Sequence, residues 1–257
     1  MVPLRRRLLP KYWFRGRVFV SYPKSGRTWM RYVLNLVDCK VKFTHAGHGT
    51  ANVRELGEPF VAPLVADLGQ KNIFMFRDPI DTAVSLYFQL HKTDLAPSSD
   101  AYPEKFEKLK SLGRLPPKEI DDFVLHPIWG VEQICKFNRA WLNLFNQHES
   151  GLVIRYETAK ADPETTIRSL LAFVGVHGFD PADIAMRSNF DAMKALELTG
   201  AGKHLGLHGM RDNDPASAKV RRGVVGGYRH HLSEETIANA KAVSNGFGFA
   251  GSKFHQP

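Results

Sequence analysis

Apolar and polar residues alternate along the chain in a pattern that predicts strands, each leading into a helix. Three short runs rich in Val, Ile and Phe predict buried strands at 17–22, 72–76 and 151–155. Each is followed by a polar loop and by apolar residues at every third or fourth position, which predicts helices at 28–37, 80–89 and 164–174. This alternation favours a single α/β domain, with a parallel central sheet flanked by helices on both faces. Ligands of such sheets bind at the carboxyl ends of the strands.

Two long segments interrupt the alternation. Residues 90–130 carry two modest helical patterns and precede an amphipathic helix predicted at 131–145, whereas 199–218 is rich in Gly and polar residues without periodicity. Segments of this kind near the strand ends of an α/β domain tend to form lids or acceptor-binding loops. We therefore expect a domain with both insertions near its active site, a basic and aromatic amino-terminal segment and a short tail, at 17–250, 1–16 and 251–257.

The composition is that of a folded globular chain, with 257 residues, 43% hydrophobic and 24% charged. Two cysteines, Cys39 and Cys135, cannot form a disulfide framework. The sequence has no apolar run of membrane-spanning length, and Pro10 and Lys11 cut short the apolar pair that precedes them, so a signal-peptide core is lacking. These features favour a cytoplasmic protein.

The charge balance points to an anionic partner. Lys and Arg number 35 against 26 Asp and Glu, a net charge of +9. The basic residues are dispersed, whereas duplex-binding proteins concentrate them on one face, so nucleic acid is not the expected partner. A polyphosphorylated small molecule fits better. Residues 5–14 mix cations and aromatic rings as membrane-surface segments do, so peripheral membrane contact stays open beside a tail packed on the domain.

The loop after the first strand, Pro23-Lys24-Ser25-Gly26-Arg27-Thr28, carries the clearest chemical signal. A strand, a tight loop and a helix place backbone N–H groups and a lysine around one point, which is an anion site. The alternative is a plain turn with a solvated lysine. The order GxxxxGK[ST] of ATP-binding loops is absent, and a kinase would need a Mg²⁺ ligand at a strand end. Asp78 is the only candidate, and Pro79 beside it favours a helix start instead.

The segment Tyr22-Pro23-Lys24-Ser25-Gly26-Arg27-Thr28-Trp29 closely resembles the 5′-phosphosulfate loop of sulfotransferases that use 3′-phosphoadenosine 5′-phosphosulfate (PAPS). Further segments follow in the family's order, at 77–85, 155–163, 188–194 and 221–226. The resemblance spans roughly 18–232. It implies a P-loop-like nucleotide-binding topology, PAPS as co-substrate, 3′-phosphoadenosine 5′-phosphate (PAP) as product, and no required metal.

The resemblance also implies roles for the matching residues. Those assigned to the 5′ end of the donor are Lys24, Ser25, Gly26, Arg27 and Thr28, although the Arg27 side chain replaces a small residue and either touches the donor or points outward. Those assigned to the 3′-phosphate are Arg77, Ser85, Arg221, Arg222 and Gly223. Those assigned to adenine are Trp29, Tyr156, Ser188 and Phe190. A helix-start salt bridge with a surface serine, and ordinary core packing of the rings, are the structural alternatives.

Sulfuryl transfer, like phosphoryl transfer, requires in-line attack and stabilisation of charge on the leaving oxygen. The family places Lys24 at that oxygen. A hydroxyl acceptor, favoured over an amine, also needs a base of near-neutral pKa, which points to histidine. His45 is preferred because 42–45 reads as a short strand with the family's terminal Thr-His pair, and His48 is the alternative. Ser85 completes the catalytic candidates.

The acceptor stays open at this stage. Both insertions are expected to form its pocket, with a lining from Phe88, Phe123, Trp129, His204 and His208. A small-molecule, glycan or lipid hydroxyl fits this reading equally well. Gly227 and Tyr228 stand where many family members have Asp-Trp, so the oligomeric state is not inherited from the resemblance.

Overall fold

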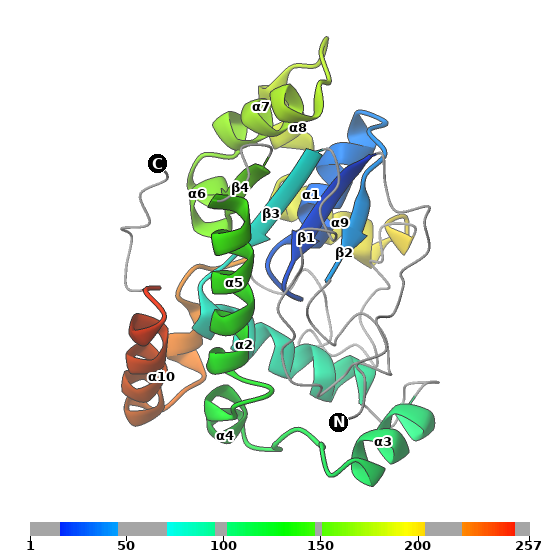
Figure 1. The fold of residues 1–257 in the computed structure, drawn as a ribbon. Helices are drawn as coiled ribbons and strands as arrows, with labels where there is room; N and C mark the ends of the chain where they lie inside the picture. The colour runs from blue at the N-terminus through cyan, green and yellow to red at the C-terminus, as the bar shows by residue number, and fades with distance from the viewer. Residues whose placement is uncertain (1–15, 46–70, 96–101, 147–150, 204–222, 250–257) are drawn as a thin grey trace, which may run out of the picture.

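The computed structural model describes residues 16–45, 71–95, 102–146, 151–203 and 223–249, and at their centre lies a four-stranded parallel sheet (Figure 1). Its strands, in the spatial order β2-β1-β3-β4, are β2 (Lys42–Thr44), β1 (Arg17–Ser21), β3 (Lys71–Phe76) and β4 (Gly151–Arg155). In the register of the sheet, Phe19 of β1 lies between Phe43 and Ile73 of its two neighbours. The predicted parallel sheet is confirmed, and the strand bounds match those expected within one residue.

Helices cover both faces of the sheet, as the alternating pattern predicts, and build two separate cores. Val18, Phe74 and Phe76 point into the first core, whose main helices are α2 (Pro79–Gln89), α5 (Val131–Asn146) and α10 (Glu234–Gly246). Phe19 and Met75 point into the second core. Its helices are α1 (Arg27–Leu36), α6 (Tyr156–Ala161), α7 (Pro163–Val174) and α8 (Pro181–Arg187).

Two helix starts follow the signals in the sequence. Asp162 caps α7 by accepting the N–H of Thr165 at 3.0 Å, with Pro163 as the first helical residue. Asp78 caps α2, and its carboxylate accepts the N–H groups of Ile80 and Asp81, each at 2.9 Å. The helix-start interpretation of Asp78 is therefore confirmed, and the carboxylate that a kinase would use for Mg²⁺ serves the backbone here.

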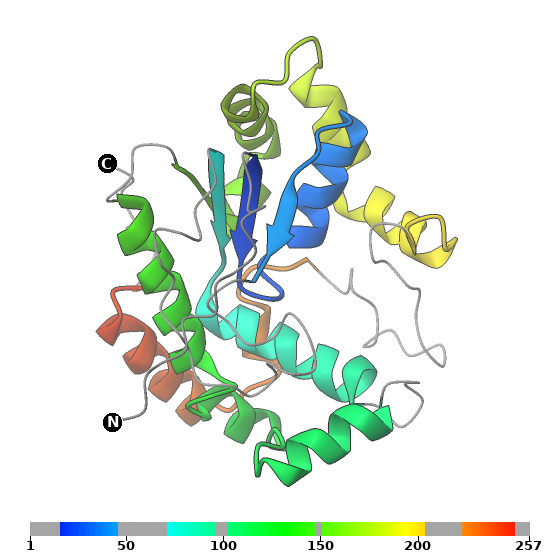
Figure 2. The same cartoon turned by 45° about the vertical axis from the view of Figure 1, so that its right-hand side comes forward.

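The insertion after α2 forms helices at the carboxyl edge of the sheet. Both modest helical patterns are confirmed, as α3 (Tyr102–Ser111) and α4 (Ile120–Leu125), preceded by a π-helical turn, η2 (Leu90–Asp94). Figure 2 shows α2 and α3 beneath the arrowheads of the strands. The second insertion lies mostly outside the described residues. Two further elements flank it, α9 (Phe190–Leu198) and η5 (Gly227–His230).

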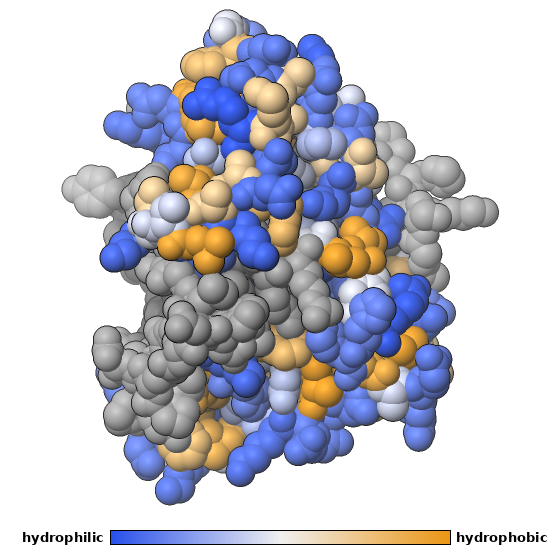
Figure 3. Space-filling view, turned by 180° about the vertical axis from the view of Figure 1, so that it is seen from behind, coloured by the Kyte–Doolittle hydropathy of each residue, from blue (hydrophilic) through white to orange (hydrophobic). Residues whose placement is uncertain are grey.

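The two cysteines are buried free thiols on opposite faces of the sheet, Cys39 in the second core and Cys135 in the first. Within the described ranges, every helix is too short or too polar to cross a bilayer. The face seen in Figure 3 is mainly hydrophilic, with hydrophobic residues in small separate patches. Ligands of parallel α/β sheets bind at the carboxyl ends of the strands, so a functional site is expected at that edge of the sheet.

Candidate functional site

The loop between β1 and α1 is tightly turned and leaves a helix amino terminus facing the strand ends. Lys24 and Gly26 both have left-handed backbone angles, with φ of 70° and 99°. A β-carbon on Gly26 would lie 2.8 Å from side-chain atoms of Met75 and Tyr156, so only glycine fits. Within the part of the chain that the structure describes, no side chain caps α1, and the buried hydroxyl of Ser25 has no hydrogen-bond partner. Unpaired N–H groups and a hydroxyl suit an anion.

His45 follows β2 directly and lies beside the end of β1. Its Nδ1 is 2.5 Å from the carbonyl oxygen of Ser21, and its side chain is buried. A carbonyl can only accept, so Nδ1 carries the hydrogen and the neutral ring keeps its lone pair on Nε2. An imidazole in this tautomer can accept a proton at Nε2.

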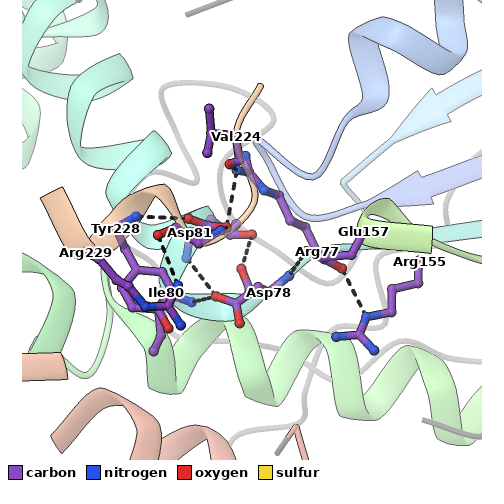
Figure 4. A network of polar contacts seen from close by, with 11 residues as sticks. Arg77, Asp78, Ile80, Asp81, Arg155, Glu157, Val224, Tyr228 and Arg229 are labelled. Atoms are coloured by element: carbon purple, nitrogen blue, oxygen red, sulfur yellow. Dashed lines mark hydrogen bonds and ion pairs between the residues drawn. The ribbon is translucent and has the colours of Figure 1, made fainter. Parts of the chain in front are cut away.

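Arg77 follows β3 and reaches the chain that precedes η5, as Figure 4 shows. Its guanidinium donates to the carbonyl of Val224 at 3.1 Å and lies 3.6 Å from the buried carboxylate of Asp81. Asp81 in turn accepts the N–H groups of Gly226 at 2.7 Å and Tyr228 at 3.2 Å. The start of α2 and residues 223–228 are thereby joined, although they are some 145 residues apart in the sequence.

Aromatic side chains gather on the other side of the loop. Trp29 donates from Nε1 to the hydroxyl of Ser188 at 3.3 Å and meets the ring of Tyr156 edge-on at 6.2 Å. The guanidinium of Arg77 lies 4.6 Å from the centre of the Tyr156 ring. Gly223, with φ of 61°, is so close to Phe190 that a β-carbon would lie 2.8 Å from its ring. Burial raises the pKa of the Tyr156 phenol, so Tyr156 acts as a neutral ring.

Most of the residues expected from the sequence thus lie around one edge of the sheet. Those joined by the contacts above are Gly26, Trp29, Arg77, Tyr156, Ser188, Phe190 and Gly223. Lys24 and Ser25 lie in the adjoining loop, Arg27 and Thr28 at the start of α1, and His45 directly after β2. Ser85 is half-buried within α2. Phe123 and Trp129 are fully buried in the first core, and Phe88 is partly buried against it. The expected residues that lie outside the described ranges are His48, His204, His208, Arg221 and Arg222.

Sequence reasoning missed two carboxylates of this site. Asp81 stands four residues after Arg77, a helical spacing that could have identified it as a partner. Glu157 accepts the N–H of Asp78 at 2.8 Å and the Nε–H of Arg155 at 3.1 Å. The contact of Glu157 with Asp78 depends on the pairing of β3 with β4, which local sequence does not reveal.

Comparison with known proteins identifies the class of protein. A model of the sulfotransferase domain matches residues 59–246, which is more than half of the chain and includes the segments at 77–85, 155–163, 188–194 and 221–226. The chain therefore belongs to the sulfotransferase domain family. It is a sulfotransferase, and the family assignment made from the motifs is confirmed.

Individual relatives are distant but extend over most of the chain. Cytosolic sulfotransferase 17 of Arabidopsis thaliana is 23% identical over 91% of this chain and 75% of its own length. The crystal structure of mouse sulfotransferase SULT7A1 complexed with PAP matches with a TM-score of 0.58 at 20% identity, over 90% of this chain and 84% of its own. Retinol dehydratase in complex with androsterone and inactive cofactor PAP matches with a TM-score of 0.60 at 15% identity, over 95% and 83%. Both structures share the fold of this chain.

Proposed function

We propose that this sulfotransferase moves a sulfuryl group from PAPS to a hydroxyl acceptor, with Lys24 at the leaving oxygen and His45 as base. The single observation that best supports the proposal is the contact of Arg77 with Val224, next to Gly223 against Phe190. These contacts bring a cation and an aromatic ring to one edge of the sheet, and a 3′-phosphorylated adenosine needs both. The neighbouring structures named above contain PAP, which agrees with this donor.

Donor binding divides into three parts. The N–H groups at the start of α1, the Ser25 hydroxyl and Lys24 bind the 5′-phosphosulfate, and the unpaired hydroxyl and tight turn at Gly26 fit such an anion. The 3′-phosphate is bound by Arg77 and Ser85 together with the residues that adjoin Gly223, namely Arg221 and Arg222. Adenine lies among Trp29, Tyr156, Ser188 and Phe190, and stacking on a ring contributes about 1–3 kcal/mol per base.

Transfer needs two protein groups at the reacting atoms. His45 Nε2 accepts the proton of the acceptor hydroxyl as its oxygen bonds to sulfur, while the hydrogen bond from Nδ1–H to Ser21 holds the ring and stabilises the imidazolium. Lys24 stabilises the negative charge that builds on the bridging oxygen as its bond to sulfur breaks. The proton stays on His45 and the electron pair stays on the departing nucleotide.

We assign the insertions at 90–130 and 199–218 to the acceptor pocket, because α2 and α3 lie at the carboxyl edge of the sheet (Figure 2). The androsterone complex of retinol dehydratase supports a small hydroxyl compound as the acceptor class. The name of the Arabidopsis thaliana relative supports a cytoplasmic location.

Calorimetry tests donor binding. Without Mg²⁺, PAP should bind at least tenfold more tightly than AMP, because only PAP carries the 3′-phosphate that Arg77, Arg221 and Arg222 are assigned to hold. Equal affinities would remove that assignment. Binding of ATP only with Mg²⁺, and not of PAP, would favour the kinase alternative.

Enzyme assays test the chemistry. Lys24→Ala and His45→Ala should each lower kcat by about 10²–10⁴-fold, while His45→Ala leaves PAP affinity within about twofold. The exposed His230→Ala is the matched control and should keep wild-type turnover. Full activity of His45→Ala would transfer the role of base to His48.

A further inference from the structure

Helix α1 presents different residues to its two sides. Trp29 contacts Ser188, which follows α8, and Tyr32 packs against Met193 of α9. Arg27 and Arg31, four residues apart, share a face turned toward β2, because the Arg31 guanidinium lies 4.9 Å from the Phe43 ring. The side of α1 that carries Arg27 is therefore opposite to the side assigned to adenine.

From the geometry of the two elements, we infer that Arg27 lies about level with His45. Because α1 connects the parallel strands β1 and β2, it runs antiparallel to them. Starting from the contact of Arg31 with Phe43, the step back along the helix to Arg27 covers about 6 Å, and the step along the strand direction to His45 covers about 6.6 Å. Both steps run toward the carboxyl ends of the strands, so they end at about the same distance along the strand direction. Helical side chains lean toward the amino terminus, which directs Arg27 toward the strand ends where His45 lies.

The charge of Arg27 has no counter-ion within the described residues. Its side chain is half-buried, and there it makes no ion pair or side-chain hydrogen bond. Burial and the nearby charge of Arg31 lower its pKa to about 10, so it stays cationic at neutral pH. A partly desolvated cation without an anion costs free energy, which a bound anion would recover.

We propose that the Arg27 side chain binds an anionic group on the acceptor, a carboxylate, sulfate or phosphate close to the hydroxyl that receives the sulfuryl group. The proposal rests on the proposed function, because the acceptor hydroxyl is located by His45. The planar guanidinium suits such groups, since it donates two parallel hydrogen bonds to their oxygens. The backbone N–H of Arg27 still serves the donor. The acceptor class narrows to compounds that already carry a negative charge.

Transfer from PAPS labelled with ³⁵S to small molecules of a cell extract tests the proposal. The labelled products of the wild-type enzyme should carry at least one anionic group besides the new sulfate, and should therefore elute from an anion exchanger later than the labelled monosulfate of a neutral alcohol. For an acceptor identified from its labelled product and then purified, Arg27→Met should raise the KM by about 10- to 100-fold. The KM of PAPS should stay within about twofold of the wild-type value. Arg168→Met, which removes an exposed arginine of α7, is the control and should change neither.

Each other result decides against the proposal in a distinct way. Products whose only charge is the new sulfate, or an unchanged acceptor KM in Arg27→Met, would overturn it while leaving sulfuryl transfer intact. If Arg27→Met raised the KM of PAPS and left the acceptor KM unchanged, the Arg27 side chain would be assigned to the donor instead. No labelled product from the wild-type enzyme would refute the proposed function, and this inference with it.

Discussion

Asp81 joins α2 to the chain that follows Arg222, and Asp81→Asn measures what this connection contributes. The Asp81 carboxylate is 3% exposed, accepts two backbone N–H groups and lies 3.6 Å from Arg77. Hydrogen bonds to a charged group contribute about 1.5–3 kcal/mol each. Asparagine keeps the shape and one acceptor but turns an NH₂ group toward the other N–H or toward Arg77. The free energy of unfolding should therefore fall by about 2–4 kcal/mol.

Asp81→Asn should also lower the affinity for PAP more than the affinity for AMP. Because residues 223–228 would lose an anchor, the arginines before them should hold a 3′-phosphate less well, and PAP affinity should fall about tenfold or more. AMP lacks that phosphate, so its affinity should change less than about twofold. Denaturant unfolding and calorimetry provide both readouts, and the isosteric Glu164→Gln, at an exposed ion pair with Arg168, should change stability by less than about 1 kcal/mol.

Two outcomes would refute this reasoning. Unchanged stability of Asp81→Asn would mean that the buried hydrogen bonds to Gly226 and Tyr228 carry little energy. Lower stability with an unchanged ratio of PAP to AMP affinity would mean that the connection supports the fold without serving phosphate recognition.

Three further predictions concern the loop, a half-buried histidine and the thiols. Gly26→Ala places a β-carbon 2.8 Å from two side chains, at a residue whose φ of 99° is unfavourable for alanine. Tm should therefore fall by at least about 2–4 °C, and PAP binding should be lost. An unchanged Tm would contradict the contact. Burial lowers the pKa of His91 in the folded protein, so below about pH 6.5 the unfolded chain binds the proton more readily and the free energy of unfolding falls toward pH 5. His91→Phe should lose less stability between pH 7 and pH 5 than the wild type or the exposed control His230→Phe. Equal losses in the three proteins would refute this. Burial raises the pKa of Cys135 to about 12 and also that of Cys39, so neither should react with a thiol reagent at pH 8 until the chain unfolds; rapid native labelling would count against it.

Local patterns were sufficient for the elements but not for their arrangement. The strand at 151–155 could be predicted because an apolar run is bounded by polar residues, and Asp162-Pro163 marks the start of α7. The order β2-β1-β3-β4 depends on which strands pair across long separations, and no local signal encodes it. β2 has only three residues, too few for periodicity to define its end.

In the candidate site, too, local sequence predicted some residues and left their contacts undetermined. Motifs identified the residues around Lys24 and Arg77, because backbone turns and helix starts have short sequence signatures. The hydrogen bond that fixes the tautomer of His45 could not be predicted, since its acceptor is a carbonyl on a neighbouring strand. The partners of Asp81 were equally hidden, because they are backbone groups that any residue would provide.

The cores on the two faces of the sheet are built by different helices. Trp29 and Tyr156, which we assign to adenine, pack with the second core, whereas the π-helical turn, α3 and α4 contribute to the first. Substitutions among the first-core residues of α3 and α4 would therefore change the packing of the first insertion without touching Trp29 or Tyr156. The proposed acceptor pocket can thus change in evolution while the proposed adenine contacts are retained.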